Sequence, residues 1–362
     1  MTLQPNTIEL MARARADLRM GLGVVLVGPD GGALVFSAET LTAARLAAAR
    51  TLGAPVVALT ARRAETLKAR AYDGDVARVL LPADAGLGWV TALADPAGDL
   101  ATPMKGPLAS ERGGDAGLHR AAIRLCKAAR LLPAALVVRV PDAAGLAHGS
   151  GLTLLPAPEV ERLSLAASPL NGVIDARLPM EVSDAGRLHV FRPENGGEEH
   201  YAIEVGEPDR AAPVLARLHS ACFTGDVMGS LKCDCGPQLR GALAQMGAEG
   251  AGVLLYLNQE GRGIGLANKM RAYSLQDQGF DTVEANHRLG FEDDERDFRI
   301  GAALLRRLGF SRARLLTNNP RKVAMLDRNG IEVVERVPLR VGRGAHNTAY
   351  LDTKAAKSGH LL

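Results

Sequence analysis

The stretch that decides the fold is VLLYLNQEGRGIGLANKMRAYSLQDQ, residues 253–278. It joins a short apolar run at 253–257, typical of a buried strand, to a helical pattern over 266–278. Further along the chain the same reasoning predicts helices over 300–308 and 321–329 and strands over 313–317 and 331–334. Upstream, 189–191 and 201–205 flank Asn195-Gly196, a pair that favours a tight hairpin turn. The second half is therefore predicted to form a mixed sheet with helices.

The first half alternates short apolar runs with Ala-rich segments of helical spacing. The predicted strands are 24–27, 56–59, 79–81 and 135–140, and the predicted helices are 41–52, 119–132 and, after the boundary, 238–246. Proline-punctuated sequence between 150 and 178 predicts a boundary near residue 175. We expect two domains, 1–175 and 176–362, in the α/β (α+β) class.

Composition excludes several functions. The 362 residues carry 43 basic and 40 acidic side chains, a net charge of +3 that is too balanced for a protein that coats nucleic acid or membrane. The longest uncharged stretch, 143–158, is too short and too rich in Gly and Pro for a membrane span. Glu9 and Arg13 precede any sustained apolar run, so no secretory signal is expected and a cytoplasmic location follows.

Three cysteines cluster at Cys222, Cys233 and Cys235. Three thiolates in so short a segment predict one tetrahedral zinc ion. With three protein ligands the fourth position stays open, which is typical of catalytic sites; His219 as a fourth ligand would instead close a structural site. Both interpretations stay open at this point, as does a third in which the cysteines are unpaired core thiols. Cys126 lies in an Ala/Leu-rich helical segment and is predicted to be a core residue.

Two strand-to-helix junctions are candidate phosphate sites. One is 259–265 with Arg262 among its glycines, and the other is 317–322 with Lys322. The alternative interpretation is an ordinary turn or a capped helix. The acidic run 292–297 is either a source of catalytic or magnesium-binding carboxylates or a solvated surface, and His287 before it is expected to have only a surface or packing role.

Together these segments closely resemble GTP cyclohydrolase II of riboflavin biosynthesis, over about residues 176–362. The segments that carry the resemblance are 219–220, 222–226, 230–236, 259–265, 271–273, 275–279, 281–286, 315–320, 350–354 and 359–362. The resemblance implies that Cys222, Cys233 and Cys235 hold one catalytic Zn²⁺ per subunit. It implies that hydrolysis at C8 of the guanine of GTP opens the imidazole ring and releases formate. Pyrophosphate leaves separately, with Mg²⁺ on the triphosphate, and the product is a diaminopyrimidinone bearing phosphoribosylamine.

The resemblance also implies residue roles and a homodimer. Asp294 matches the family's proton acceptor, Arg296 the residue that attacks or stabilises the α-phosphate, and Tyr273 a tyrosine that takes part in the chemistry. The implied GTP-binding residues are Arg217, Leu218, His219, Ser220, Gln238, Glu260, Gly261, Arg262, Thr282, Thr317 and Lys322.

The chain departs from the family at two positions. Ala221 stands where Glu is usual and Asn258 where Arg is common. These departures motivate two alternatives: a non-catalytic or weakly catalytic nucleotide-binding regulatory subunit, and a cyclohydrolase-like enzyme for another purine or pyrimidine.

The first half resembles 3,4-dihydroxy-2-butanone 4-phosphate synthase, but without its chemistry. Residues 28–32, Gly-Pro-Asp-Gly-Gly, replace an acidic run, and Leu118 and Arg120 replace a histidine and a glutamate. We expect a degenerate domain retained for folding, dimerisation or regulation.

Overall fold

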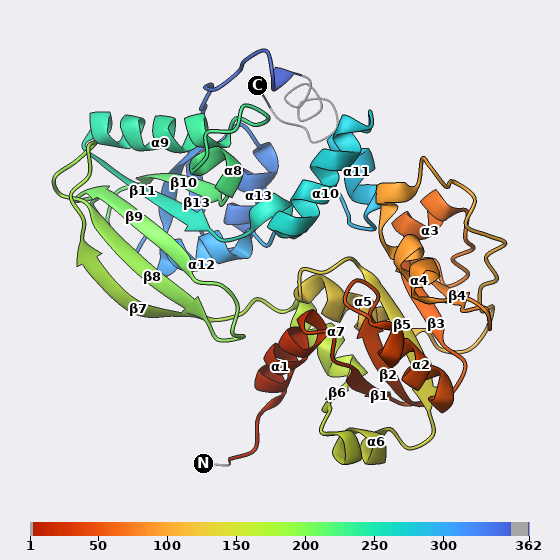
Figure 1. Cartoon of the computed structure of the whole chain (residues 1–362). Helices are drawn as coiled ribbons and strands as arrows, with labels where there is room; N and C mark the ends of the chain where they lie inside the picture. Colours follow the sequence, from red (N-terminus) through yellow and green to blue (C-terminus); the bar gives the residue numbers. More distant parts are fainter. Residues whose placement is uncertain (1–2, 349–360, 362) are drawn as a thin grey trace. The chain divides into compact units, whose positions relative to one another are not determined.

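The computed structural model describes residues 3–348 and 361. The chain forms two compact units, Met1–Ala166 with Ala267–Glu295, and Ala167–Leu266 with Arg296–Leu362 (Figure 1). The expected domains 1–175 and 176–362 differ from these units in two ways. Residue 175 falls inside strand β7 (Leu170–Arg177), which pairs with β8 (Arg187–Pro193) in the second sheet, and residues 267–295 fold with the first unit. Of the segments 350–354 and 359–362, all residues except Leu361 lie outside the described part.

The first unit contains a six-stranded sheet in the order β4-β3-β5-β2-β1-β6. Its strands are β1 (Val24–Gly28), β2 (Gly31–Ser37), β3 (Val56–Thr60), β4 (Val76–Leu80), β5 (Ala134–Val140) and β6 (Thr153–Pro156). Neighbouring strands are antiparallel except β1 and β6, which are parallel. The four strands expected in this half are confirmed as β1, β3, β4 and β5.

The first unit also contains helices. They are α1 (Thr7–Arg19), α2 (Ala43–Leu52), α3 (Ala61–Leu67), α4 (Leu87–Ala94), the short η1 (Pro96–Gly98), α5 (Gly117–Ala128), α6 (Ala143–Ser150), α7 (Ala157–Leu165), α10 (Leu266–Asp277, from its second residue) and α11 (Thr282–Arg288). Apolar side chains of α1, α5 and α7 share one core cluster with β1, β2 and β5, and Cys126 is fully buried in it. The predicted core role of Cys126 is confirmed.

The second unit contains a seven-stranded mixed sheet in the order β13-β12-β10-β11-β9-β8-β7. Its remaining strands are β9 (His200–Gly206), β10 (Val214–Ser220), β11 (Ala251–Leu257), β12 (Arg312–Leu316) and β13 (Glu332–Val337). Strands β13, β12, β10 and β11 are parallel, and β9, β8 and β7 continue antiparallel. The expected mixed sheet and the expected hairpin, β8 with β9, are confirmed.

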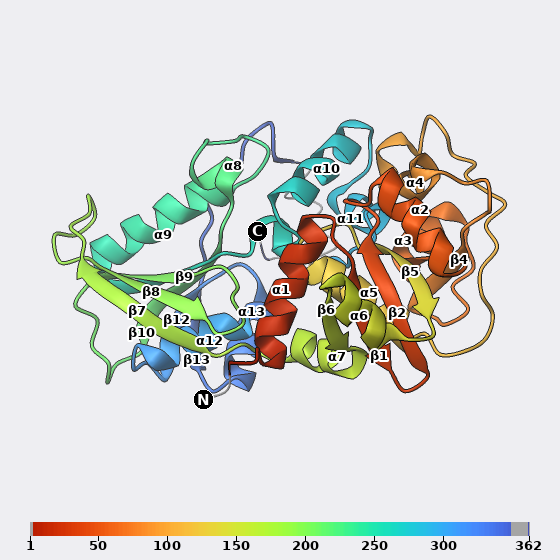
Figure 2. The same cartoon turned by 60° about the horizontal axis from the view of Figure 1, so that its bottom comes forward.

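The helices of this unit pack on both faces of its sheet. They are α8 (Phe223–Asp226), α9 (Cys235–Glu249), the short η2 (Glu260–Gly263), α12 (Arg299–Arg307) and α13 (Pro320–Arg328). Figure 2 shows α9 along one side of the sheet and α12 on the other. One core cluster joins α12 and α13 to Ala216 and Leu218 of β10, and a second joins α9 to Leu215 of the same strand. Because side chains alternate along a strand, Arg217 and His219 lie on the α9 face.

Within residues 3–348 and 361, no helix has both the length and the apolar character needed to cross a bilayer.

Candidate functional site

The three cysteines come together at the carboxyl end of β10. Cys222 caps α8, Cys233 lies in the following loop, and Cys235 begins α9. Their sulfur atoms all lie within 4.8 Å of one another, and the Sγ atoms of Cys222 and Cys233 are 3.7 Å apart. Zn–S bonds of about 2.3 Å at tetrahedral angles place two sulfurs about 3.8 Å apart. The donor set therefore fits zinc.

Two glycines make this close approach of thiols sterically feasible. A Cβ atom on Gly225 would lie 2.9 Å from Cys233 Sγ, 3.0 Å from Cys235 Cβ and 3.1 Å from Cys222 Sγ. A Cβ atom on Gly236 would lie 2.2 Å from the carbonyl oxygen of Gly225. A larger side chain at Gly225 would push the sulfur atoms apart, and one at Gly236 would displace the backbone of Gly225.

The thiols need a cation to ionise together. Hydrogen bonding with Cys222 and then Cys233, together with burial, raises the pKa of Cys235 well above its ordinary value. A bound divalent cation reverses this trend because it favours thiolates. Among the described residues, no histidine or carboxylate joins the group of three cysteines. Within the described residues, His219 thus does not complete the closed, structural site that was one of the two predicted forms.

His219 is committed elsewhere, to a buried carboxylate. Its Nε2 lies 3.0 Å from Asp226 Oδ2, an oxygen that also accepts hydrogen bonds from the Cys222 amide at 3.0 Å and the Tyr256 hydroxyl at 2.9 Å. The rings of His219 and Tyr256 stack with centroids 5.5 Å apart. Burial, followed by the charge of Asp226, raises the pKa of Tyr256. Asp226 thus connects the cysteine loop to β10 and β11, a role that sequence reasoning did not assign.

Arg217 lies buried beside the cysteine loop. Its guanidinium donates to the Leu316 carbonyl at 2.9 Å and to the side-chain oxygen of Gln238, whose amide in turn donates to Asp234 between two of the cysteines. Burial lowers the pKa of Arg217 to about 10, although the negative charge of Asp234 opposes the shift. Arg217 is therefore held as a buried cation within a hydrogen-bond chain that leads to the cysteines.

Two more cations line the same strand. Lys322 Nζ donates to the Leu218 carbonyl at 2.9 Å, and Arg296 donates to Ser220 Oγ at 3.4 Å. Both cations lie over the ring of Phe298, Lys322 at 4.8 Å and Arg296 at 4.7 Å from its centroid. The structure thus brings together seven of the predicted residues: Arg217, Leu218, His219, Ser220, Gln238, Arg296 and Lys322.

Three buried polar atoms at this end of the sheet have no hydrogen-bond partner among the described residues: Arg217 Nε, His219 Nδ1 and Gln259 Oε1. Buried polar groups are almost always paired, so unpaired groups concentrated in one place indicate a ligand. Sequence reasoning placed Gln259 in a phosphate-binding turn but gave it no binding role of its own.

The junction 259–265 after β11 matches the ordinary turn, the alternative interpretation of this candidate phosphate site. The amides of Gly263 and Gly265 donate to the carbonyls of Gln259 and Glu260, and the Gly261 amide donates to the Glu260 side chain. These glycine amides are used within the turn, so they do not form an anion cradle. Glu260 also accepts from the Phe223 amide at 2.6 Å, and Arg262 adopts a left-handed conformation with φ of 61°. Strained non-glycine residues of this kind cluster at functional sites.

The junction 317–322 combines a helix cap with a buried cation. Asn319 caps α13 by accepting from the Arg321 amide at 3.0 Å, and Thr317 Oγ1 accepts from the Asn319 amide at 3.0 Å. The capped-helix interpretation therefore holds for Asn319 and Thr317.

Three of the predicted site residues belong to the first unit: Tyr273, Thr282 and Asp294. Tyr273 lies in α10 with Lys269 Nζ 5.6 Å from its ring centroid, and Thr282 begins α11 and accepts from the Gln276 side chain at 3.2 Å. In the same acidic run, Asp293 pairs with His287 at 2.7 Å. The predicted site residues are thus divided between the two units.

The two departures from the family have local structural roles. Asn258 donates from its amide to His200 Nδ1 at 3.0 Å and from its side chain to the Glu199 carbonyl at 2.5 Å, and the Ala221 amide donates to the Leu257 carbonyl at 2.8 Å. Both positions thus join β10 or β9 to the end of β11.

Positions in the first half that would hold the synthase chemistry are filled differently. Leu118 is 3% exposed in the core of the first unit, and Arg120 pairs with Asp75 at 2.9 Å. Gly28 and Gly31 are paired at the turn between β1 and β2, where an acidic run would be expected. At these positions the chain has an apolar core residue, an ion-pair partner and a turn between two strands.

The chain is similar to several known proteins. Residues 171–338 match the family model described as GTP cyclohydrolase II. A GTP cyclohydrolase-2 from Azospirillum brasilense is 45% identical over 370 residues, covering 100% of this chain and 96% of the relative. The riboflavin biosynthesis protein RibBA of Bacillus velezensis is 45% identical over 71% of this chain and 68% of its own length.

Other similarities cover either half or nearly all of the chain. A GTP cyclohydrolase-2 from Shigella dysenteriae is 55% identical over 53% of this chain and 98% of its own length. Among solved structures, a two-domain 3,4-dihydroxy-2-butanone 4-phosphate synthase from A. baumannii covers 90% of this chain and 99% of its own, at 17% identity and a TM-score of 0.33. That structural likeness is too weak to support an argument. Identity of 45% along almost the whole of the Azospirillum relative shows that this chain belongs to the GTP cyclohydrolase II family.

Proposed function

We propose that this protein is a zinc-dependent GTP cyclohydrolase II. It hydrolyses GTP to a diaminopyrimidinone bearing phosphoribosylamine, releases formate and pyrophosphate, and so catalyses the first step of riboflavin biosynthesis. One observation carries the proposal: three thiols that fit a zinc ion are linked through Asp234 and Gln238 to the buried guanidinium of Arg217. Within residues 3–348 and 361, the Nε atom of Arg217 has no hydrogen-bond partner. A metal centre can activate water, and the buried guanidinium of Arg217 can bind an anion, so the two together suit hydrolysis of an anionic nucleotide.

Cys222, Cys233 and Cys235 would hold the zinc. When bound there, zinc supplies the activation of water and the polarisation that opening a ring at an amidine carbon requires. The chain's own contribution is to fix the three sulfurs through Gly225 and through the hydrogen bond from the Cys222 amide to Asp226.

The cations along β10 suit the triphosphate. Arg217, Lys322 and Arg296 place positive charge around one strand in a chain whose net charge is only +3. Arg296 would act at the α-phosphate, and Mg²⁺ would neutralise the departing oxygens of pyrophosphate. The unpaired Gln259 Oε1 and His219 Nδ1 suit the polar edge of the base. Leu218, Ser220, Gln238, Glu260, Gly261, Arg262, Thr282 and Thr317 complete the proposed GTP-binding set.

Proton transfer is proposed for Asp294, with Tyr273 taking part in the same chemistry. A carboxylate is an effective proton carrier when it is held within hydrogen-bond reach of the reacting group. Both assignments rest on the resemblance of these positions to the family, and both residues lie within 171–338, the part that matches its model.

The first half is proposed to be non-catalytic. Leu118 is a buried core residue and Arg120 is an ion-pair partner, and neither can hold magnesium for ribulose 5-phosphate. We further propose a cytoplasmic homodimer that requires no nucleic acid or membrane partner.

The test uses the purified full-length chain loaded with zinc and supplied with Mg²⁺ and GTP. We expect formate, pyrophosphate and the pyrimidine chromophore to appear together, and Cys235→Ala to abolish formate release. Absence of formate from the wild type, with GTP bound, would favour the regulatory alternative; turnover of another purine or pyrimidine in its place would favour the altered-substrate alternative. Conversion of ribulose 5-phosphate would contradict the assignment of the first half.

A further inference from the structure

The segment 267–295 comes from the cyclohydrolase-like part of the sequence but folds with the first unit. It comprises α10 from its second residue, α11 and the turn that follows. It carries Tyr273, Thr282 and Asp294, three residues of the proposed reaction. The question is what determines their positions within the first unit.

One attachment lies just after α11. Thr60 Oγ1, at the end of β3, donates to the Gly290 carbonyl at 2.8 Å. Gly290 has a φ of +88°, and a Cβ atom there would lie 2.8 Å from Thr60 Oγ1 and 2.9 Å from Pro133 Cγ. The next residue, Phe291, is 1% exposed. The chain is therefore pressed closely against the end of the first sheet at this point.

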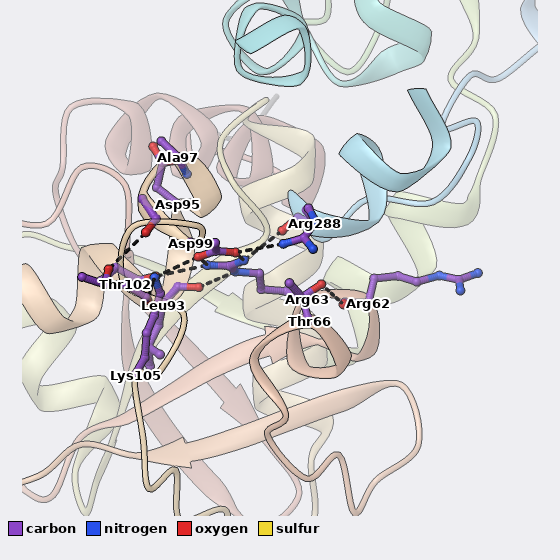
Figure 3. Close-up of polar contacts among 12 residues, drawn as sticks. Arg62, Arg63, Thr66, Leu93, Asp95, Ala97, Asp99, Thr102, Lys105 and Arg288 are labelled. Carbon is purple, nitrogen blue, oxygen red and sulfur yellow. Dashed lines mark hydrogen bonds and ion pairs between the residues drawn. The ribbon is translucent and has the colours of Figure 1, made fainter. Parts of the chain in front are cut away.

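A second attachment is the buried charge cluster drawn in Figure 3. Arg63 of α3 is 1% exposed and donates to both carboxylate oxygens of Asp99, to the Leu93 carbonyl at 2.7 Å, and to the Arg288 carbonyl at 3.4 Å. The guanidinium of Arg288 lies 3.7 Å from the same carboxylate. Burial raises the pKa of Asp99, but its bonds from Arg63 and Lys105 outweigh that effect and lower it overall. The end of α11 is thus held by an ionised, buried network of the first half.

Two further contacts fix the beginning of the segment. Asn268 donates from its side chain to the Arg130 carbonyl at 3.0 Å. Arg271, two residues before Tyr273, pairs with Glu39 at 3.0 Å. The helix that carries Tyr273 therefore has contacts of its own with the first half, separate from those of α11.

The turn that contains Asp294 is clamped on both sides. Lys127 of α5 pairs with Glu295 at 2.5 Å, and Glu295 Oε1 also accepts from the Glu292 amide at 3.0 Å, closing the turn around Asp294. On the other side, Arg62 of α3 pairs with Glu292 at 2.9 Å. Lys127 Nζ also lies 5.7 Å from the centre of the Phe291 ring. Two side chains of the first half thus determine the shape of residues 292–295.

We propose that the first half, although it has lost its own chemistry, positions the catalytic segment of the cyclohydrolase, with Lys127 and Arg62 as positioning residues for Asp294. The inference rests on the proposed function, because it takes the role of Asp294 from there. The Shigella relative aligns with about half of this chain, so this support is a feature of the two-unit chain and not a requirement of the reaction.

The test compares Lys127→Met with Arg124→Met in the full-length zinc-loaded protein. Both residues lie on α5, one turn apart, and each makes one ion pair; Arg124 pairs with Glu161 of α7 at 3.2 Å, away from residues 267–295. Methionine keeps the apolar stem of either side chain. We expect Lys127→Met to lower kcat about tenfold with little change in KM, since displacing a catalytic group by about 1 Å can cost up to about a hundredfold.

The controls separate positioning from a general loss of stability. Arg124→Met should keep wild-type kcat, both variants should keep wild-type zinc content and Tm, and Lys127→Arg should restore most of the lost rate. Equal kcat in Lys127→Met and wild type would overturn the inference while leaving the proposed function intact. An inactive wild type would instead overturn the proposed function. If Lys127→Met does not fold, Arg62→Ala takes its place, because it removes the ion pair with Glu292 on the other side of the turn. A selective loss of kcat in Arg62→Ala would support the inference, and an unchanged kcat would overturn it.

Discussion

Gly225 is the position where the smallest change should do most harm to the metal site. An alanine there would bring its Cβ atom to 2.9–3.1 Å from two of the sulfur atoms and one Cβ atom of the cysteine cluster. Non-bonded atoms pack best at about 3.5–4.0 Å, so the surrounding atoms must move by about 0.5–1 Å. Metal–ligand distances tolerate only about 0.2 Å. At least one sulfur must therefore leave its place.

The expected effect is a loss of zinc affinity of at least about a hundredfold in Gly225→Ala. Perturbing groups that merely support metal ligands typically costs about 10- to 100-fold, and displacing a ligand should reach the upper end of that range or exceed it. A hundredfold corresponds to about 2.7 kcal/mol.

The assay is competition for zinc against a chromophoric chelator, together with metal analysis of the purified protein. Gly149→Ala is the matched control, because a Cβ atom added at that position meets nothing within 4 Å. We expect the control to bind zinc like the wild type. An affinity of Gly225→Ala within about threefold of the control would refute the argument that this glycine is required for the sulfur geometry.

Two further predictions concern buried polar groups. Burial, and then the charges of Arg78 and Arg139, lowers the pKa of His119 from 6.5 to about 4, so the unfolded chain takes up a proton that the folded chain does not, and stability falls as the pH drops from 6.5 to 4. Between pH 7 and 4 the free energy of unfolding, measured with urea, should therefore fall by up to about 3 kcal/mol more in the wild type than in His119→Gln. Equal decreases in the two proteins would contradict this. Arg217→Lys keeps the charge but removes the unpaired Nε–H, so the KM for GTP should rise about tenfold at unchanged zinc content, as measured by initial rates; an unchanged KM would show that this N–H does not contact the nucleotide.

Part of the second unit could be predicted from its apolar runs. Strand β11 (AGVLLYL) is uninterrupted, and β12 (RARLL) still ends on two buried leucines. The central strand β10 could not. All but one of its residues are buried, yet Arg217 and His219 break the apolar pattern that identifies a strand. Those two side chains are buried because they face the site. The polar residues that hide β10 from a search for apolar runs are therefore the residues that give the strand its function.

The cysteine site could be predicted because its signal is local. Three thiols within fourteen residues can reach one ion whatever the rest of the chain does, whereas Asp226 becomes meaningful only once β10 and β11 bring His219 and Tyr256 to it. The same holds for the placement of 267–295. Its attachment to Thr60 and Arg63 joins residues more than two hundred positions apart, and no local pattern encodes such a contact.

The backbone passes from one unit to the other at three places, after residues 166, 266 and 295. The two halves are consequently not interchangeable modules. A gene fusion or truncation cut near mid-sequence would separate Gly290 and Phe291 from the surfaces that bury them and leave an apolar side chain in water. The first half thus constrains how this chain can be shortened or recombined during evolution, because its removal would expose residues of the segment 267–295 that it buries.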